Sequence, residues 1–204
     1  KDRLLLAGHP HHLVRKSRDQ KPVFLDEADY THCLGQIRAL SQQYELAIHA
    51  FCLLPDGLHI LATPLGDPGN LSRFMKALSC SASSRRKRLH GATSVWEVRY
   101  RSSPVEPGQW LLACMCYIER LPVTQRLASS AYHYHRSSYR MRLGKTHQYW
   151  LEDPEEYTRL GGSIEDRAEA YRMYMSNGLD PHEEKMIDTA VKRCRLTGSR
   201  HFVR

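Results

Sequence analysis

The chain has 204 residues, and its 30 Lys and Arg exceed its 22 Asp and Glu, which gives a net charge of +8 and a pI near 9.3. This length allows one well-packed core with an appendage, or at most two small domains, and the basic balance favours a polyanionic partner. The sequence has no 18-residue apolar run, no signal-peptide pattern and no paired Cys-x-x-Cys spacing, so we expect a cytoplasmic protein with no membrane span, no zinc site and reduced, buried thiols.

The first half of the chain predicts a strand, a helix and a β-hairpin in that order. Residues 11–17 form the expected strand, and residues 27–44 form the helix, for which Asp26 is a suitable N-cap. Residues 47–64 predict the hairpin, because two apolar, β-prone runs meet at a Pro-Asp-Gly turn.

One histidine, His59, lies on the second strand of this hairpin. Side chains alternate along a strand, so positions 57 and 59 share a face. A histidine at both positions would form a two-imidazole platform for a metal ion, but position 57 is a glycine.

The elements that follow complete a mixed α and β pattern. They are a helix over residues 70–89 capped by Asn70, a strand over residues 95–105, and a helix over residues 109–119 that Pro122 ends. The order β-α-β-β-α-β-α predicts an α+β fold in which helices pack on one face of an antiparallel sheet.

The composition of the sequence changes after about residue 144. An acidic stretch over residues 152–156 and a Gly-Gly break precede two predicted helices, over residues 163–175 and 181–194. A third helix is expected after Thr197. These residues form a helical extension, which is either a DNA-binding appendage or a packed cap on the first part of the chain.

Several short motifs, taken in order, resemble one known family. The most specific are residues 96–103 (WEVRYRSS) and 116–123 (CYIERLPV), and the others lie at residues 8–14, 22–26, 55–61, 71–75 and 137–140. Together they resemble the REP-associated tyrosine transposases, which belong to the HUH (His-hydrophobic-His) single-tyrosine transposases. The resemblance implies a ferredoxin-like HUH domain over residues 1–144, followed by the helical extension over residues 145–204.

The resemblance also implies a chemistry. Transposases of this class attack a DNA phosphate with a tyrosine hydroxyl, and a Mg²⁺ or Mn²⁺ ion stabilises the developing charge. Tyr117 falls on the nucleophile and His59 on the second metal-binding histidine. Gly57 falls on the first histidine, and Leu121 falls on the polar ligand one helical turn after the tyrosine. Two of the three ligands are therefore missing, and we expect metal binding to be weak or absent.

Other residues near this site are weaker candidates for metal ligands. Asp56 and Glu119 are the carboxylates that would have to substitute for the missing ligands. Asp56 is expected on the opposite strand face from His59, and Glu119 lies about 200° around the helix from Tyr117, so we do not expect either to do so. The cluster of His9, His11 and His12 is not expected to bind metal. His59 as a strand histidine without a role, and Tyr117 as a packed tyrosine or a phosphate contact, both stay open.

Arginines supply the expected DNA-binding face, because Lys and Arg contacts to phosphates dominate non-specific affinity and Arg interleaved with aromatics suits unpaired bases. A solvated charged face is the alternative. The candidates are Arg15, Arg18, Arg73, Arg85, Arg86, Arg99 and Arg101.

Three functional hypotheses follow. The first is a monomeric or homodimeric transposase-like protein that binds hairpin or single-stranded DNA of repetitive palindromic elements, with impaired strand cleavage. The second is an active single-tyrosine transposase with an unconventional metal site. The third is a regulator that binds duplex DNA through its helical tail.

Overall fold

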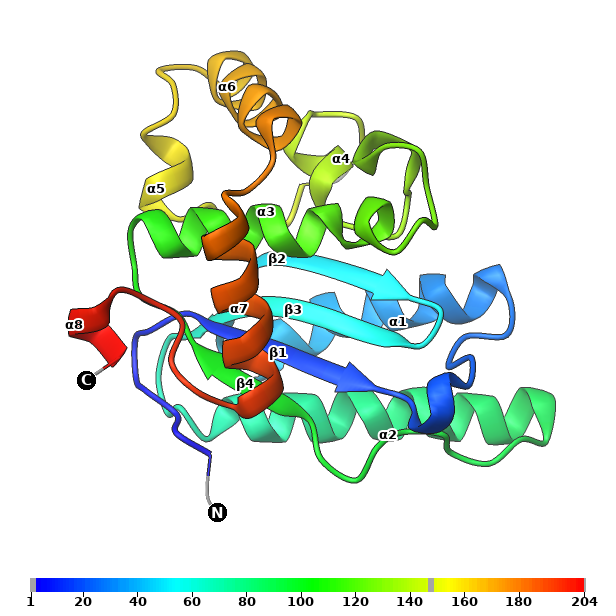
Figure 1. The fold of residues 1–204 in the computed structure, drawn as a ribbon. Helices are drawn as coiled ribbons and strands as arrows, with labels where there is room; N and C mark the ends of the chain where they lie inside the picture. Colours follow the sequence, from blue (N-terminus) through cyan, green and yellow to red (C-terminus); the bar gives the residue numbers. More distant parts are fainter. Residues whose placement is uncertain (1–2, 147–148, 204) are drawn as a thin grey trace.

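The computed structural model describes residues 3–146 and 149–203, and a four-stranded antiparallel sheet lies at its centre (Figure 1). The strand order is β2-β3-β1-β4, which is the order of a ferredoxin-like βαββαβ unit and confirms the predicted α+β fold. The strands are β1 (His11–Lys16), β2 (Leu46–Leu54), β3 (Gly57–Pro64) and β4 (Arg101–Pro104).

Helices cover both faces of this sheet. α1 (Glu27–Gln43) and α2 (Asn70–His90) pack on one face, where Leu13 and Ile60 enter a shared core. α3 (Gln109–Thr124) packs on the other face against Ala50 and Leu61. The sequence predicted that all helices lie on one face, and this is correct for α1 and α2 but not for α3. Because side chains alternate along β3, Ile60 and its neighbour His59 point to opposite faces, and His59 points toward α3.

The β2–β3 hairpin differs from the expected turn by one residue. Leu54 pairs with Gly57, so Pro55 and Asp56 form a two-residue turn and Gly57 is the first residue of β3. Lys16 pairs with Gly57 from the other side, which places this glycine between two strands.

Two predicted boundaries are wrong. Residues 95–100 do not extend β4: the Val95 carbonyl and the Glu97 amide bond to the chain at the end of β1 instead, and Trp96 makes an isolated bridge to Ser17. Pro122 does not end α3, because its ring lies within the last turn and the Gln125 amide still donates to the Leu121 carbonyl at 2.8 Å.

The C-terminal extension packs against α3. Its side chains Tyr157, Tyr171 and Ile187 share one apolar core with α3, and α7 also contacts β1 and β4. In Figure 1, α6 lies above α3 while α7 runs down past α3 toward β4. The elements after α3 are a 3₁₀ turn (Ala131–His133), α4 (Tyr139–Arg142), α5 (Glu155–Thr158), α6 (Ile164–Asn177), α7 (Pro181–Arg193) and α8 (Arg200–Val203).

A buried polar network joins the extension to the first part of the chain. The Glu119 carboxylate of α3 pairs with the Arg142 guanidinium at 3.1 Å, and both side chains are fully buried. The same carboxylate accepts hydrogen bonds from Ser138 and, at 2.6 Å, from Tyr171 of α6. Glu119 is therefore committed to holding α3, α4 and α6 together.

The structure also bears on the expectations of buried, reduced thiols and of no membrane span. All six cysteines are free, but Cys80 and Cys194 are exposed rather than buried. Within residues 3–146 and 149–203, the helices are all too short or too polar to cross a membrane.

Candidate active site and nucleic-acid interface

Tyr117 of α3 and His59 of β3 both contact a second histidine, His12, between α3 and the sheet. His12 of β1 and His59 of β3 come from neighbouring antiparallel strands, and their Nε2 and Nδ1 atoms are 3.0 Å apart. The Tyr117 ring packs edge-on against the His12 ring with centroids 5.8 Å apart. The structure thus brings the predicted nucleophile and the predicted ligand into one cluster through His12.

His12 was missed as a site residue, although it belongs to the histidine run noted in the sequence. Alternation along β1 sends His11 to the other face, where its Nδ1–H donates to the His9 carbonyl and its Nε2 accepts from the Leu6 amide. Only His12 reaches Tyr117. The available signal was the ferredoxin-like strand order, which places β1 beside β3.

Both histidines of the pair are neutral. Burial lowers the pKa of His12 to about 3 and lowers the pKa of His59 well below its ordinary value. In a neutral pair, one ring nitrogen donates and the other accepts. The outer nitrogens, His12 Nδ1 and His59 Nε2, are buried and have no hydrogen-bond partner in the described part of the chain.

The Tyr117 hydroxyl is engaged by the C-terminal extension. It donates to the Asp188 carboxylate of α7 at 3.3 Å, and the side chain is only 9 % exposed. Burial and the neighbouring Asp188 raise the pKa of Tyr117 above its ordinary value. Asp188 also accepts a hydrogen bond from Lys192 at 2.8 Å, so α7 holds the carboxylate beside the phenol.

Neither of the two positions where the family resemblance implies a metal ligand, Gly57 and Leu121, carries a donor atom. A Cβ atom at Gly57 would lie 2.3 Å from the Arg15 carbonyl oxygen and 3.1 Å from Lys16 Cα, so a side chain there requires the strands to shift. Leu121 is 5 % exposed and packs in the apolar core. Two imidazoles without a grouped oxygen donor do not fit the requirements of Mg²⁺ or Mn²⁺.

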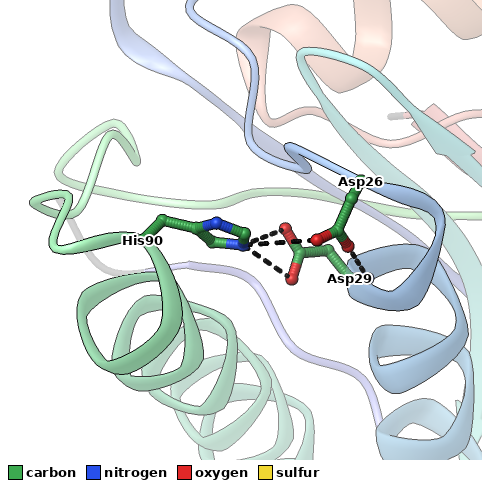
Figure 2. Close-up of side chains that lie close together, drawn as sticks. All are labelled: Asp26, Asp29 and His90. Carbon is green, nitrogen blue, oxygen red and sulfur yellow. Dashed lines mark hydrogen bonds and ion pairs between the residues drawn. The ribbon is translucent and has the colours of Figure 1, made fainter.

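A second cluster of metal-type ligands lies between α1 and α2. Asp26, Asp29 and His90 are the only three His, Cys, Asp or Glu residues of the described ranges whose ligand atoms lie within 4.8 Å of one another (Figure 2). Asp29 already accepts hydrogen bonds from Arg85 at 2.7 Å and from the Leu25 amide at 2.9 Å. Burial opposes ionisation, but these donors lower the pKa of Asp29. The cluster is thus a clip that ties the start of α1 to the end of α2.

Five of the seven predicted DNA-binding arginines lie around the α1/α2 side of the sheet or the loops beside it. Arg85 pairs with Asp29, and Arg86 donates to the Pro22 and Val23 carbonyls at 3.0 and 3.2 Å. Arg73 pairs with Asp67 on the surface. Arg18 donates to the Ser94 carbonyl, and the half-buried Arg15 lies over the Trp96 ring. Their DNA-binding roles stay predictions.

The other two, Arg99 and Arg101, lie in a groove at the edge of the sheet. This edge groove has a volume of about 1240 Å³ and is formed by the N-terminal segment, the approach to β4 and the end of α7. The contribution of α7 was not predicted, because basic residues in the last turn of a helix are also the ordinary complement of the helix dipole. The lining residues are Arg3, Leu4, Glu97, Val98, Arg99, Tyr100, Arg101, Lys192, Arg193, Cys194, Arg195, Leu196 and Val203.

Comparison with known proteins places this geometry in a known fold. No protein-family model and no curated protein matches the chain, but solved structures do. A REP-associated tyrosine transposase bound to a REP hairpin superposes with a TM-score of 0.62 at 16 % identity, over 75 % of this chain and 91 % of that chain. The chain has the fold of a REP-associated tyrosine transposase.

A second solved structure, a candidate transposase from Deinococcus radiodurans, is 21 % identical and covers 62 % of this chain and 94 % of that chain, with a TM-score of 0.39. The REP-associated transposase fold extends over three quarters of the chain. This fold is the one that the motif order predicted.

Proposed function

We propose that the protein binds hairpin or single-stranded DNA and that strand cleavage by Tyr117 is impaired. A solved protein with the same fold is a transposase bound to a REP hairpin, and this chain carries a net charge of +8 with a basic groove at its sheet edge. Phosphate contacts by Lys and Arg supply most non-specific affinity for nucleic acid, which supports DNA as the partner.

The single observation that carries impaired cleavage is the state of Tyr117. Phenol is a weak nucleophile with an ordinary pKa of about 10, so cleavage requires help to remove its proton and to stabilise charge on the phosphate. Here burial and Asp188 raise the pKa of Tyr117 further. Gly57 and Leu121 supply no metal ligand, and the phenol is turned toward α7.

The second candidate is an active nuclease that uses Asp188 as a base. The Tyr117–Asp188 hydrogen bond favours it, because a carboxylate at 3.3 Å can accept the phenolic proton. The large difference in proton affinity between a carboxylate and a phenol argues against efficient transfer. A regulator that binds duplex DNA through its tail stays a third hypothesis, supported by the basic end of α7.

Binding and cleavage are tested separately. Fluorescence anisotropy with a labelled DNA hairpin should show affinity that falls steeply with salt, and a denaturing gel with Mg²⁺ or Mn²⁺ should show no covalent adduct. An adduct that disappears in Tyr117→Phe would instead establish an active enzyme. Failure to bind hairpin or single-stranded DNA at low salt would remove the proposed function altogether.

A further inference from the structure

The edge groove combines strong positive charge with open apolar surface. Six of its lining side chains are Lys or Arg and one is a carboxylate, Glu97. Glu97 is engaged by Arg101 at 2.9 Å. Val98 is 89 % exposed and Leu4 is 50 % exposed, so apolar atoms lie on the surface between the cations. This mixture suits a ligand with phosphates on one side and uncharged rings on the other.

Three of the cations in this groove make no side-chain hydrogen bond or ion pair with the described residues. Arg99, Arg193 and Arg195 are exposed, and their guanidinium groups have no hydrogen-bond or ion-pair partner among the described residues. They come from segments that are far apart in the sequence but line one groove. By contrast, Arg85 and Arg86 on α2 are occupied by protein acceptors. The edge groove therefore presents the free positive charge that a polyanion requires.

The edge groove is also linked to the tyrosine site. Lys192 lines the groove and pairs with Asp188, and Asp188 accepts the hydrogen bond of Tyr117. A phosphate that pairs with Lys192 would therefore lie one side chain away from the carboxylate that holds the phenol. The groove and the site share α7 as a common wall.

We propose that the edge groove binds a single strand of DNA, with phosphates on Arg99, Lys192, Arg193 and Arg195 and unpaired bases over Val98 and Leu4. This inference rests on the proposed function and assigns its strand-binding surface. Unpaired bases are favoured over a duplex, because the exposed apolar side chains can contact base faces only where the bases are not stacked within a helix. Trp96 and Tyr100 are 6 % and 7 % exposed and do not supply the stacking surface that the sequence predicted.

The native cysteines provide the first test. Cys194 lines the groove and is exposed, whereas Cys80 is exposed on α2 and does not line it. A thymidine hexanucleotide should slow alkylation of Cys194 by iodoacetamide several-fold and leave Cys80 unchanged. Equal rates at Cys194 with and without a hexanucleotide that binds, or equal protection of both thiols, would overturn the proposal.

Removal of charge from two different segments that line the groove provides the second test. Arg99→Gln and Arg193→Gln should each reduce the slope of log affinity against log salt by about 0.7 for single-stranded DNA, which is the value for one lost phosphate contact. Lys185→Gln is the matched control, because Lys185 is exposed on the same helix outside the groove. The two arginine variants should be additive.

Two DNA probes separate this proposal from the proposed function. A hairpin with a single-stranded thymidine extension should bind the parent protein more tightly than the blunt hairpin, and Arg99→Gln/Arg193→Gln should abolish that gain. A gain that persists in the double variant, or an equal loss on both probes, would overturn the groove while leaving hairpin binding intact. If the parent protein binds neither probe, the proposed function itself fails.

Discussion

At Gly57 the main chains of β3 and β1 lie so close together that there is no space for a side chain. A Cβ atom there would lie 2.3 Å from the Arg15 carbonyl oxygen. Any side chain must push β3 away from β1, and the shift would reach His59 two residues along. A histidine at position 57 would therefore require the two strands to separate.

The first prediction concerns the stability of variants at this glycine. Gly57→Ala should lower the free energy of unfolding by about 1–3 kcal/mol, as expected for an overpacked core position. Gly35→Ala is the matched control: its Cβ has open space within α1, and it should raise stability by about 0.5–1 kcal/mol. Urea denaturation measures both. Equal stability of Gly57→Ala and the parent protein would show that the strands separate easily at this point.

The second prediction concerns the buried histidine pair. An unfolded histidine takes up a proton below about pH 6.5, whereas His12 resists protonation in the fold until about pH 3. The folded-state pKa is depressed, so the unfolded state binds more protons and stability is lost as pH falls below 6.5. The neutral, buried His12 should therefore lower the free energy of unfolding by about 1.4 kcal/mol between pH 7.5 and pH 5.5.

Replacing one member of the pair tests this sign. His12→Leu should reduce the loss of unfolding free energy between those two pH values by about 1.4 kcal/mol, measured in urea. His182→Gln, at an exposed position at the start of α7, should leave the loss unchanged. An unaltered pH dependence in His12→Leu would mean that the imidazole is protonated within the fold.

At the scale of elements, features that depend on neighbouring residues, such as helix caps, could be predicted from the sequence, whereas contacts between distant elements could not. The Asp26 side chain caps α1 as expected, and Ser163 opens α6 with a reciprocal capping box, because these bonds need only neighbouring residues. The ferredoxin-like order came from the motif sequence. His12 and Asp188 were missed because their placement beside Tyr117 depends on strand pairing and on the docking of α7, which no local pattern encodes.

The third prediction concerns the network that joins α3, α4 and α6. Glu119→Gln removes the fully buried one of the two carboxylates that pair with the Arg142 guanidinium and should lower the free energy of unfolding by about 3–5 kcal/mol. The control is Glu169→Gln, which removes an exposed pair with Arg172 on α6 and should change the urea midpoint little. Comparable midpoints for the two variants would show that water reaches Arg142 or that Asp153 alone suffices.

At the scale of the whole molecule, residues 1–144 and the C-terminal extension share one apolar core, although the sequence predicted a separate domain and extension. Tyr157, Tyr171 and Ile187 fill the space over α3, and Tyr171 also bonds to Glu119. Removing them exposes an apolar helix face and leaves a carboxylate with fewer partners. The extension is therefore expected to be part of the folding unit rather than a module that can be detached.

The fourth prediction tests that division with two truncations. A fragment of residues 1–144 should lose cooperative thermal unfolding and bind the dye ANS, because the core over α3 is open and the Asp153 partner of Arg142 is gone. A fragment of residues 1–199 lacks only α8 and keeps the Ser199–Glu106 hydrogen bond, so it should unfold cooperatively. If the short fragment unfolds cooperatively and does not bind ANS, residues 1–144 are an independent domain. The core under α7 is then a docking surface, and the Tyr117–Asp188 hydrogen bond is a contact that the protein can release without unfolding.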